Sequence, residues 1–303
     1  MSELNGLNRK YLRTQDLRRL KNVFFSSRRV VEGQYAGRHA SPQRGHSVEF
    51  NDYRQYMPGD EVADIDWKVY GRSDKMFIKL FEHQSDMTVN LVVDGSASMA
   101  YAGLDGRYSK YDHACLMAAA IAFLTTKQQD KVSFALAKEG LDVFHRPYGS
   151  FGHLVGVLKA METTRPAGQA RLAEALRKAA SLIGRKGLLV VFSDFLDDLE
   201  EIFNALSIFT HRGSEVIAFH VLHADELKLP SAAEAIFQDS ESGQRLPVSV
   251  EDVRPAYEVK LAEFLTAVSS NCKGRGMDYN LVSTAVSYNT ALEQYLFQRA
   301  AMV

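Results

Sequence analysis

One stretch of this 303-residue chain carries residue types that bind metal ions. Residues 89–99 read as a short apolar strand that ends in Asp94, with Ser96 and Ser98 following at alternate positions. The Asp-x-Ser-x-Ser spacing puts one carboxylate and two hydroxyls on a single tight loop. Hard oxygen ligands of this kind suit Mg²⁺ or Mn²⁺ rather than zinc. Because ligands of open α/β sheets bind at the carboxyl ends of strands, this loop is a candidate metal site.

A second strand-end carboxylate extends this candidate site. Residues 187–194 read as a buried strand that ends in Asp194. Neighbouring strands of a doubly wound sheet can bring Asp94 and Asp194 over one crevice, although they lie far apart in sequence. The predicted ligands are therefore Asp94, Ser96, Ser98 and Asp194. A helix expected to begin near Ser109 would add the positive end of its dipole, which favours an anionic partner group.

The elements that must position these residues alternate between strands and helices from about residue 87 onward. We expect strands over 87–93, 131–137, 187–194, 215–221 and 278–282, with 141–144 as the hairpin neighbour of 131–137. Helical patterns cover 114–125, 151–162, 170–183, 197–210 and 256–271. The capping boxes Ser109-x-x-Asp112 and Thr290-x-x-Glu293 each predict a helix start. This alternation predicts an α/β fold with a doubly wound, mostly parallel sheet covered on both faces.

Two regions depart from the alternation. Residues 224–254 break it, with Gly243 between short alternating runs, and we expect an inserted hairpin there. Near the N-terminus we expect a helix over 11–25 and then a small β-rich subdomain over 30–85, including a strand at 76–81. The predicted domains are therefore 1–85, a helix plus β-rich subdomain, and 86–303, the α/β domain.

Charge is uneven in the first domain. Residues 1–48 hold ten Lys/Arg against three Asp/Glu, and residues 49–85 hold eight acidic against five basic residues. The basic stretch could bind nucleic acid or an acidic partner. We favour a solvated helix face with salt bridges to the following acidic segment, because no known nucleic-acid module accompanies the arginines.

Composition describes a globular protein of the reducing cytosol. The chain is 46% hydrophobic and 24% charged, with a formal net charge of -1 and two cysteines. That charge implies no whole-protein attraction to nucleic acid or membrane. Two cysteines give no disulfide framework, and we find neither a signal-peptide core nor about 18 consecutive apolar residues. We expect a cytoplasmic location and no membrane insertion.

The Asp-x-Ser-x-Ser loop resembles the metal-ion-dependent adhesion site (MIDAS) of von Willebrand factor type A domains. Those domains normally carry a threonine on a second loop, and the matching position here is Ala170. Gln169 could offer its amide oxygen, and Thr163 or Thr164 could reach in. Two interpretations stay open: a weak Mg²⁺ or Mn²⁺ site, or hydroxyls that only cap the loop and the next helix.

A wider resemblance covers almost the whole chain. Residues 44–60 read RGHSVEFNDYRQYMPGD, and DIDWK, FIKLFE, the DGSASM loop and DYNLVST follow in order. This succession resembles bacterial domain-of-unknown-function family 58. The resemblance implies a von Willebrand factor type A-like domain preceded by the β-rich segment. It also implies association with a MoxR-type AAA+ ATPase, with the type A protein acting as an adaptor or chaperone partner for a client protein.

The family's Arg-x-Tyr-x-Pro-Gly-Asp segment suggests a second candidate site. Its partner-binding candidates are Arg54, Tyr56, Asp60, Asp66 and Trp67. They could form a docking surface beside the crevice. Alternatively, the arginine pairs with an aspartate and the single tryptophan fills a core, which we favour.

Catalytic motifs are scarce. The chain has no Gly-x-x-x-x-Gly-Lys-Ser/Thr loop and no Gly-x-Ser-x-Gly elbow. His220-x-x-His223 has no further ligand at zinc-site spacing, so structural roles are expected. A metal-dependent hydrolase remains an alternative, as does nucleic-acid binding through the basic N-terminus. The working hypothesis is a non-enzymatic interaction module whose partner donates a Glu or Asp to the bound metal.

Overall fold

The computed structural model describes residues 9–13, 25, 48–55, 69–71, 76–83, 87–104, 106 and 108–301. The chain divides into two compact units, Gly33–Asp86 and a larger one made of Met1–Glu32 with Met87–Val303. The first 32 residues thus group with the larger unit, whereas the sequence-based division placed them with the β-rich subdomain. The physical reason is burial, because Tyr11, Leu12 and Phe25 lie in the core of the larger unit.

The smaller unit contains one antiparallel strand pair. β1 (Val48–Gln55) pairs with β2 (Phe77–His83), with an irregular register between Phe50 and Asp52. β2 is the strand expected at 76–81. Such a pair is the β-rich element that the sequence predicts for this region.

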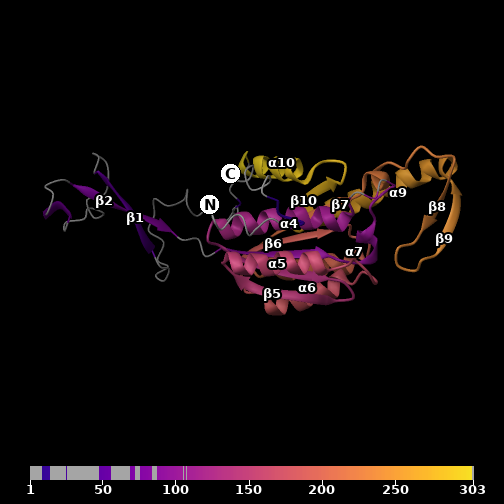
Figure 1. Cartoon of the computed structure of the whole chain (residues 1–303). Coiled ribbons are helices and arrows are strands. Elements are labelled where there is room, and N and C mark those ends of the chain that lie inside the picture. Colours follow the sequence, from indigo (N-terminus) through magenta and orange to yellow (C-terminus); the bar gives the residue numbers. More distant parts are fainter. Residues whose placement is uncertain are drawn as a thin grey trace. The chain divides into compact units, whose positions relative to one another are not determined.

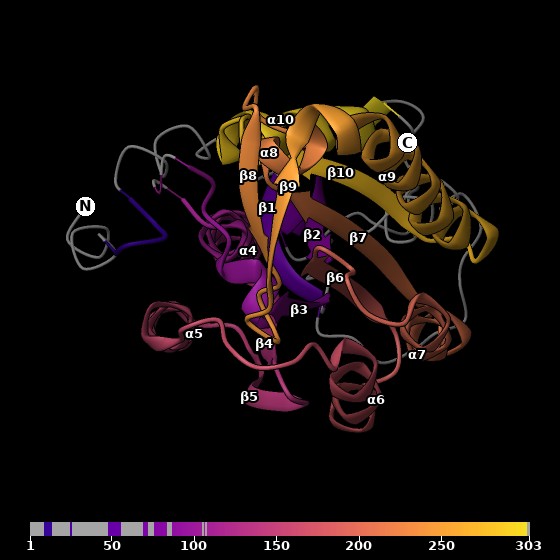
Figure 2. The same ribbon diagram turned by 90° about the vertical axis from the view of Figure 1, so that its right-hand side faces the viewer.

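The larger unit is built on a six-stranded sheet that contains β5, β6, β7 and β10 (Figure 1). The strand order is β10-β7-β6-β3-β4-β5 (Figure 2). All neighbouring strands are parallel except β4 and β5. The doubly wound, mostly parallel fold class is therefore confirmed. The strands are β3 (Thr88–Asp94), β4 (Lys131–Ala137), β5 (Leu141–Tyr148), β6 (Gly187–Ser193), β7 (Ser214–Leu222) and β10 (Asp278–Ser283).

Helices cover both faces of this sheet (Figure 2). The inner strands are buried nearly throughout, which explains their continuous apolar runs. One face packs against α4 (Lys110–Lys127), α5 (Phe151–Thr163) and α10 (Tyr288–Ala301). The other packs against α6 (Leu172–Leu182), α7 (Leu199–His211) and α9 (Val250–Gly274).

The strand order reverses beside β3. From β3 the chain moves to β4 on one side, and after β5 it crosses back to β6 on the other side. Such a switch point opens a crevice at the carboxyl ends of the two strands. Gly187 permits the close pairing, since its φ is +127° and an added Cβ would lie 2.7 Å from the Thr88 carbonyl oxygen.

The expected insertion is present, with different bounds. After the short helix α8 (Ala224–Leu227), the strands β8 (Glu234–Gln238) and β9 (Arg245–Ser249) form an antiparallel hairpin. α9 then begins at Val250, earlier than the helix predicted over 256–271, and includes Pro255 within its first turns. Pro255 is the sixth residue of this helix, so it has no amide hydrogen to donate to the Glu251 carbonyl, and α9 continues past it.

Helix starts follow the expected caps in one case of two. Ser109 and Asp112 form the predicted capping box of α4. α10 starts before Thr290, and the Ser287 hydroxyl accepts from the Thr290 amide, so the Thr290 prediction is wrong. Of the helix predicted over 11–25, residues 11 and 12 belong to a tight turn closed between Arg9 and Leu12, and residues 13 and 25 are not helical. Residues 14–24 lie outside the described residues.

No helix among the described residues is long and apolar enough to cross a membrane. Both cysteines are buried free thiols.

Candidate functional site

The crevice at the switch point holds the two predicted aspartates. Asp94 ends β3, Asp194 directly follows β6, and both are buried, at 3% and 1% exposure. The two loops are linked by the Ser193 hydroxyl, which donates to Asp94 Oδ2 at 2.6 Å. The structure therefore gathers residues that are 100 positions apart into one polar cluster, as parallel pairing of β3 with β6 requires.

The loop after β3 folds around its own carboxylate. The Ser96 amide donates to Asp94 Oδ1 at 2.9 Å, and the hydroxyls of Ser96 and Ser98 lie 3.1 Å apart. A short 3₁₀ helix, η4 (Ala97–Ala100), follows at once and holds Ser98 in place. One carboxylate and two adjacent hydroxyls thus share a buried loop, as their spacing predicts.

The loop after β6 turns through an unusual backbone conformation. Phe195 has a φ of +55°, which is costly for a bulky residue, and its buried ring stacks on Phe203. This turn directs the Phe195 amide to Ser193 Oγ at 2.9 Å and the Leu196 amide to Asp194 Oδ1 at 3.2 Å. The strained residue therefore fixes the orientation of the Asp194 carboxylate.

Lys110 is a crevice residue that the sequence analysis did not select. Its side chain is fully buried, and its ammonium lies 2.7 Å from Asp194 Oδ2 and 2.6 Å from Glu226 Oε1. Burial alone would lower the pKa of this ammonium, but the two carboxylates outweigh burial and the pKa is raised. A lysine in the first turn of a helix opposes the helix dipole, and this mismatch is the sequence signal that points to a buried anionic partner.

Asp94 has no such partner in the described part of the chain. Its hydrogen-bond donors are a hydroxyl and an amide, both neutral. Burial, followed by the nearby charge of Asp194, raises its pKa to about 6. The cluster of Asp94, Asp194, Glu226 and Lys110 therefore carries more negative than positive charge when all four groups are ionised.

The second loop of the resembled site lacks a side-chain ligand here. Ala170 lies at the threonine position, and the loop before it is tied to the Asp94 loop by the hydrogen bonds Ala97 N to Gly168 O and Ala167 N to Gly95 O, both 3.0 Å. The Ala170 amide donates to Glu241 Oε1 at 3.0 Å, from the turn of the β8–β9 hairpin. A carboxylate of the chain itself therefore reaches the edge of the crevice.

The two threonines considered as replacements are engaged elsewhere. The hydroxyls of Thr163 and Thr164 donate to carbonyl oxygens at the end of α5, at 2.9 Å and 2.8 Å. Gln169 is exposed to solvent.

The donor chemistry of the crevice fits a hard divalent cation. All four candidate side chains offer oxygen atoms, and the surplus negative charge at Asp94 favours a positive ion. Among the described residues no group of three or more His, Cys, Asp or Glu side chains gathers as a metal cage. A cation would therefore rely on the two serine hydroxyls and on water beside the two carboxylates.

The comparisons with known proteins identify the family. The sequence profile of a family described as "Protein of unknown function DUF58" matches residues 52–264. The chain belongs to the DUF58 family. Uncharacterized proteins Mb1516 of Mycobacterium bovis and Rv1480 of Mycobacterium tuberculosis are each 28% identical to it over 228 residues, covering 74% of this chain and 70% of the relative.

Solved structures resemble this DUF58 chain only distantly. BatB from Bacteroides thetaiotaomicron has 14% identity and a TM-score of 0.44, covering 72% of this chain and 100% of its own. The SpRpn10 VWA domain has 9% identity and a TM-score of 0.42, covering 69% and 94%. A von Willebrand factor type A protein from Catenulispora acidiphila has 10% identity and a TM-score of 0.39, covering 73% and 43%. These values describe a likeness of general architecture and carry nothing about function.

The second candidate site of this DUF58 chain falls largely outside the described residues. This holds for Tyr56, Asp60, Asp66 and Trp67, and only the backbone of Arg54, in β1, is described. The predicted docking surface stays a prediction.

The histidine pair has structural contacts. His220 Nδ1 lies 3.0 Å from the Tyr279 hydroxyl, and burial lowers its pKa to about 4. His223 caps α8.

In the basic N-terminal stretch, Arg9 pairs with Glu162 and Lys10 with Asp112. Those carboxylates belong to the larger unit rather than to residues 49–85.

Proposed function

We propose that this chain is a non-enzymatic protein-interaction module that binds Mg²⁺ or Mn²⁺ through Asp94, Ser96, Ser98 and Asp194 and presents it to a carboxylate of a partner. One observation supports the proposal most strongly: the Asp94 carboxylate is buried at a sheet switch point, without a cationic partner among the described residues. A buried carboxylate in this state is costly unless it is protonated or meets a cation.

The chain's own residues prepare the crevice. Lys110 neutralises and orients Asp194, so that Asp94 carries the surplus charge. The Ser193 hydroxyl and the Ser96 amide hold the Asp94 carboxylate in one orientation. When bound, the metal would supply a positive charge that attracts an acidic side chain. Because each protein ligand is already ordered, little conformational entropy is lost when the site is filled.

The partner proposal rests on the family. Resemblance to the family implies a MoxR-type AAA+ ATPase, with the DUF58 chain as adaptor or chaperone partner in the assembly or remodelling of a client. ATP-driven rearrangement of the ATPase could load or release the contact at the crevice. A metal-dependent hydrolase is the competing function, and nucleic-acid binding through the basic N-terminus is a third.

The experiment is a binding assay between the full chain and a purified MoxR-type AAA+ ATPase from the same genome. We expect complex formation with Mg²⁺, a loss of at least about tenfold in affinity with EDTA, and the same loss for Asp94→Asn. Asp142→Asn, on the far strand β5, is the matched control and should bind normally. Equal binding by Asp94→Asn and wild type would contradict the metal-dependent contact. Ester or phosphoester turnover that is lost in Asp194→Asn would favour the hydrolase.

A further inference from the structure

A second feature of the same end of the molecule is a cavity beneath the β8–β9 hairpin. It has a volume of about 790 Å³ and is enclosed by the hairpin, the region after η4, and the segment from α8 to α9. The size lies within the range of roughly 300–1,000 Å³ typical of binding pockets. Ser98 is at its edge, so the cavity adjoins the crevice.

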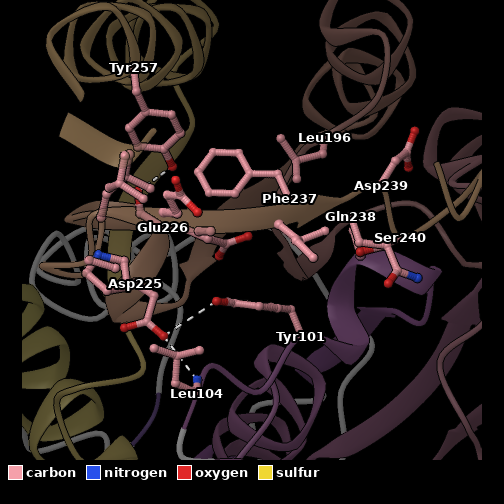
Figure 3. Close-up of a pocket in the computed structure, with 18 of the residues that line it drawn as sticks. Tyr101, Leu104, Leu196, Asp225, Glu226, Phe237, Gln238, Asp239, Ser240 and Tyr257 are labelled. Carbon is pink, nitrogen blue, oxygen red and sulfur yellow. Dashed lines mark hydrogen bonds between the residues drawn. The ribbon is translucent and has the colours of Figure 1, made fainter. Parts of the chain in front are cut away.

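The cavity combines apolar side chains with acidic ones, and the apolar side chains come from several elements. Figure 3 shows Tyr101, Leu196, Phe237 and Tyr257 pointing into the space from different elements. Two of the lining side chains are largely exposed to solvent, Leu104 at 84% and Ile236 at 67%. Large apolar side chains that are exposed around one opening favour interaction with another chain.

The charged side chains that line the cavity are all acidic. The titratable acids are Asp225, Glu226, Glu234, Asp239 and Glu241, and no lysine, arginine or histidine is found among the described residues that line the space. Glu226 is paired with Lys110. Asp225 accepts from the Leu104 amide at 3.2 Å, and Glu241 from the Ala170 amide. Asp225 also lies 3.5 Å from His223 Nδ1. Glu234, Asp239 and Glu241 lie on the hairpin, and no lysine or arginine that lines the cavity balances them among the described residues.

We infer that this cavity is a docking site for a basic, amphipathic segment of a partner protein. Apolar side chains of the segment enter the space between Phe237, Leu196 and Tyr101, and its lysines or arginines meet the acidic rim. The exposed apolar surface around the opening favours a polypeptide over a small organic cation. This inference goes beyond the proposed function, because it involves neither the metal nor a partner carboxylate.

The test measures anisotropy of two short fluorescein-labelled peptides with the full-length protein in EDTA. One peptide alternates lysine and phenylalanine, and the other alternates glutamate and phenylalanine. We expect saturable binding of the lysine peptide alone, weakening as NaCl is added. No binding of the lysine peptide, or equal binding of both, would overturn the inference. Competition by spermine as effective as that by unlabelled peptide would instead assign the cavity to a small cation and also overturn it.

Charge-neutralising variants locate the site. The combined variant Asp225→Asn, Glu234→Gln, Asp239→Asn and Glu241→Gln keeps one acceptor oxygen at each position, and it should weaken lysine-peptide binding by at least about tenfold. The matched control neutralises four exposed glutamates outside the lining: Glu200, Glu258, Glu263 and Glu293. Equal affinities for the two variants would contradict the site. Phe237→Ser should also weaken lysine-peptide binding. Because this change leaves every charge in place, the loss would show that apolar contact contributes to binding as well as charge. Because EDTA is present throughout, failure of the metal site leaves this result unchanged.

Discussion

The loop after β3 and the loop after β6 reach one crevice with equally buried aspartates, but their charges are balanced differently. Asp194 meets the buried ammonium of Lys110 at 2.7 Å, whereas Asp94 meets only neutral donors. The Lys110 ammonium balances the charge of Asp194, whereas we propose that Asp94 keeps a charge that an external cation can use.

The largest effect is expected from Lys110→Met. Removing the ammonium leaves Asp194 and Glu226 without their cation, and breaking a buried pair in this way typically costs about 3–5 kcal/mol of unfolding free energy. Urea denaturation of the variant measures the loss. The control is Lys10→Met, whose partner Asp112 is reached from an exposed position and whose loss should cost at most about 1 kcal/mol. Similar losses of unfolding free energy for the two variants would show that the buried pairs of Lys110 stabilise the fold no more than the exposed pair of Lys10.

Asp94→Asn should instead stabilise the fold. Because the pKa of Asp94 is raised from 3.8 to about 6 in the folded protein, ionisation disfavours the folded state. Without metal, the variant should therefore unfold with a higher free energy at neutral pH, by up to about 3 kcal/mol. Urea denaturation in EDTA measures the gain, and a destabilised variant would show that the Asp94 charge is compensated.

The raised pKa of Asp94 also makes the unfolding free energy depend on pH. Between about pH 4 and pH 6 the folded wild type binds more protons than the unfolded chain at this position, so this group's contribution to stability falls as pH rises. His220 acts oppositely, because burial lowers its pKa to about 4 and acid then destabilises the fold. The contribution of Asp94 alone is the difference in unfolding free energy between Asp94→Asn and wild type. This difference should grow from about pH 4 to pH 6 and stay constant at higher pH. A difference that does not change with pH would count against the raised pKa.

The smallest effect concerns the hairpin. Glu241→Ala removes the acceptor of the Ala170 amide, a single hydrogen bond to a charged group worth about 1.5–3 kcal/mol locally. We expect hydrogen exchange at the Ala170 amide to become at least about tenfold faster, while exchange in β3 and β6 is unchanged. Glu241→Gln keeps an acceptor and should retain protection. Unchanged exchange in Glu241→Ala would mean that this contact does not hold the hairpin.

The fold was largely predictable because its signals are local. Continuous apolar runs such as 188–192, which is short and contains two valines, favour a buried strand, and the capping box at Ser109 marks the start of α4 within one residue. The end of the insertion was less predictable, since α9 begins at Val250, six residues before the predicted start at 256, and includes Pro255. At 11–13, a helical spacing of apolar residues instead serves burial of Tyr11 and Leu12 in a turn.

Of the crevice residues, the sequence placed the two aspartates and the two serines of the Asp94 loop together, and their role as metal ligands stays a prediction. Asp94 and Asp194 were identified because strand ends of a parallel sheet meet at one edge. Lys110, Glu226 and Glu241 were missed, because their contacts join segments 84, 116 and 71 positions apart. Such pairings depend on the tertiary arrangement of α4, α8 and the hairpin, for which no local pattern exists.

The most direct test of the central claim is a calorimetric titration of Mg²⁺ into the full-length protein at neutral pH, beside Asp94→Asn. The account predicts one saturable site in the wild type, no binding in the variant, and weaker wild-type binding below about pH 6, where protons compete for Asp94. Wild-type and variant titrations with the same heats would contradict it, because the unbalanced carboxylate would then have no role in holding a cation.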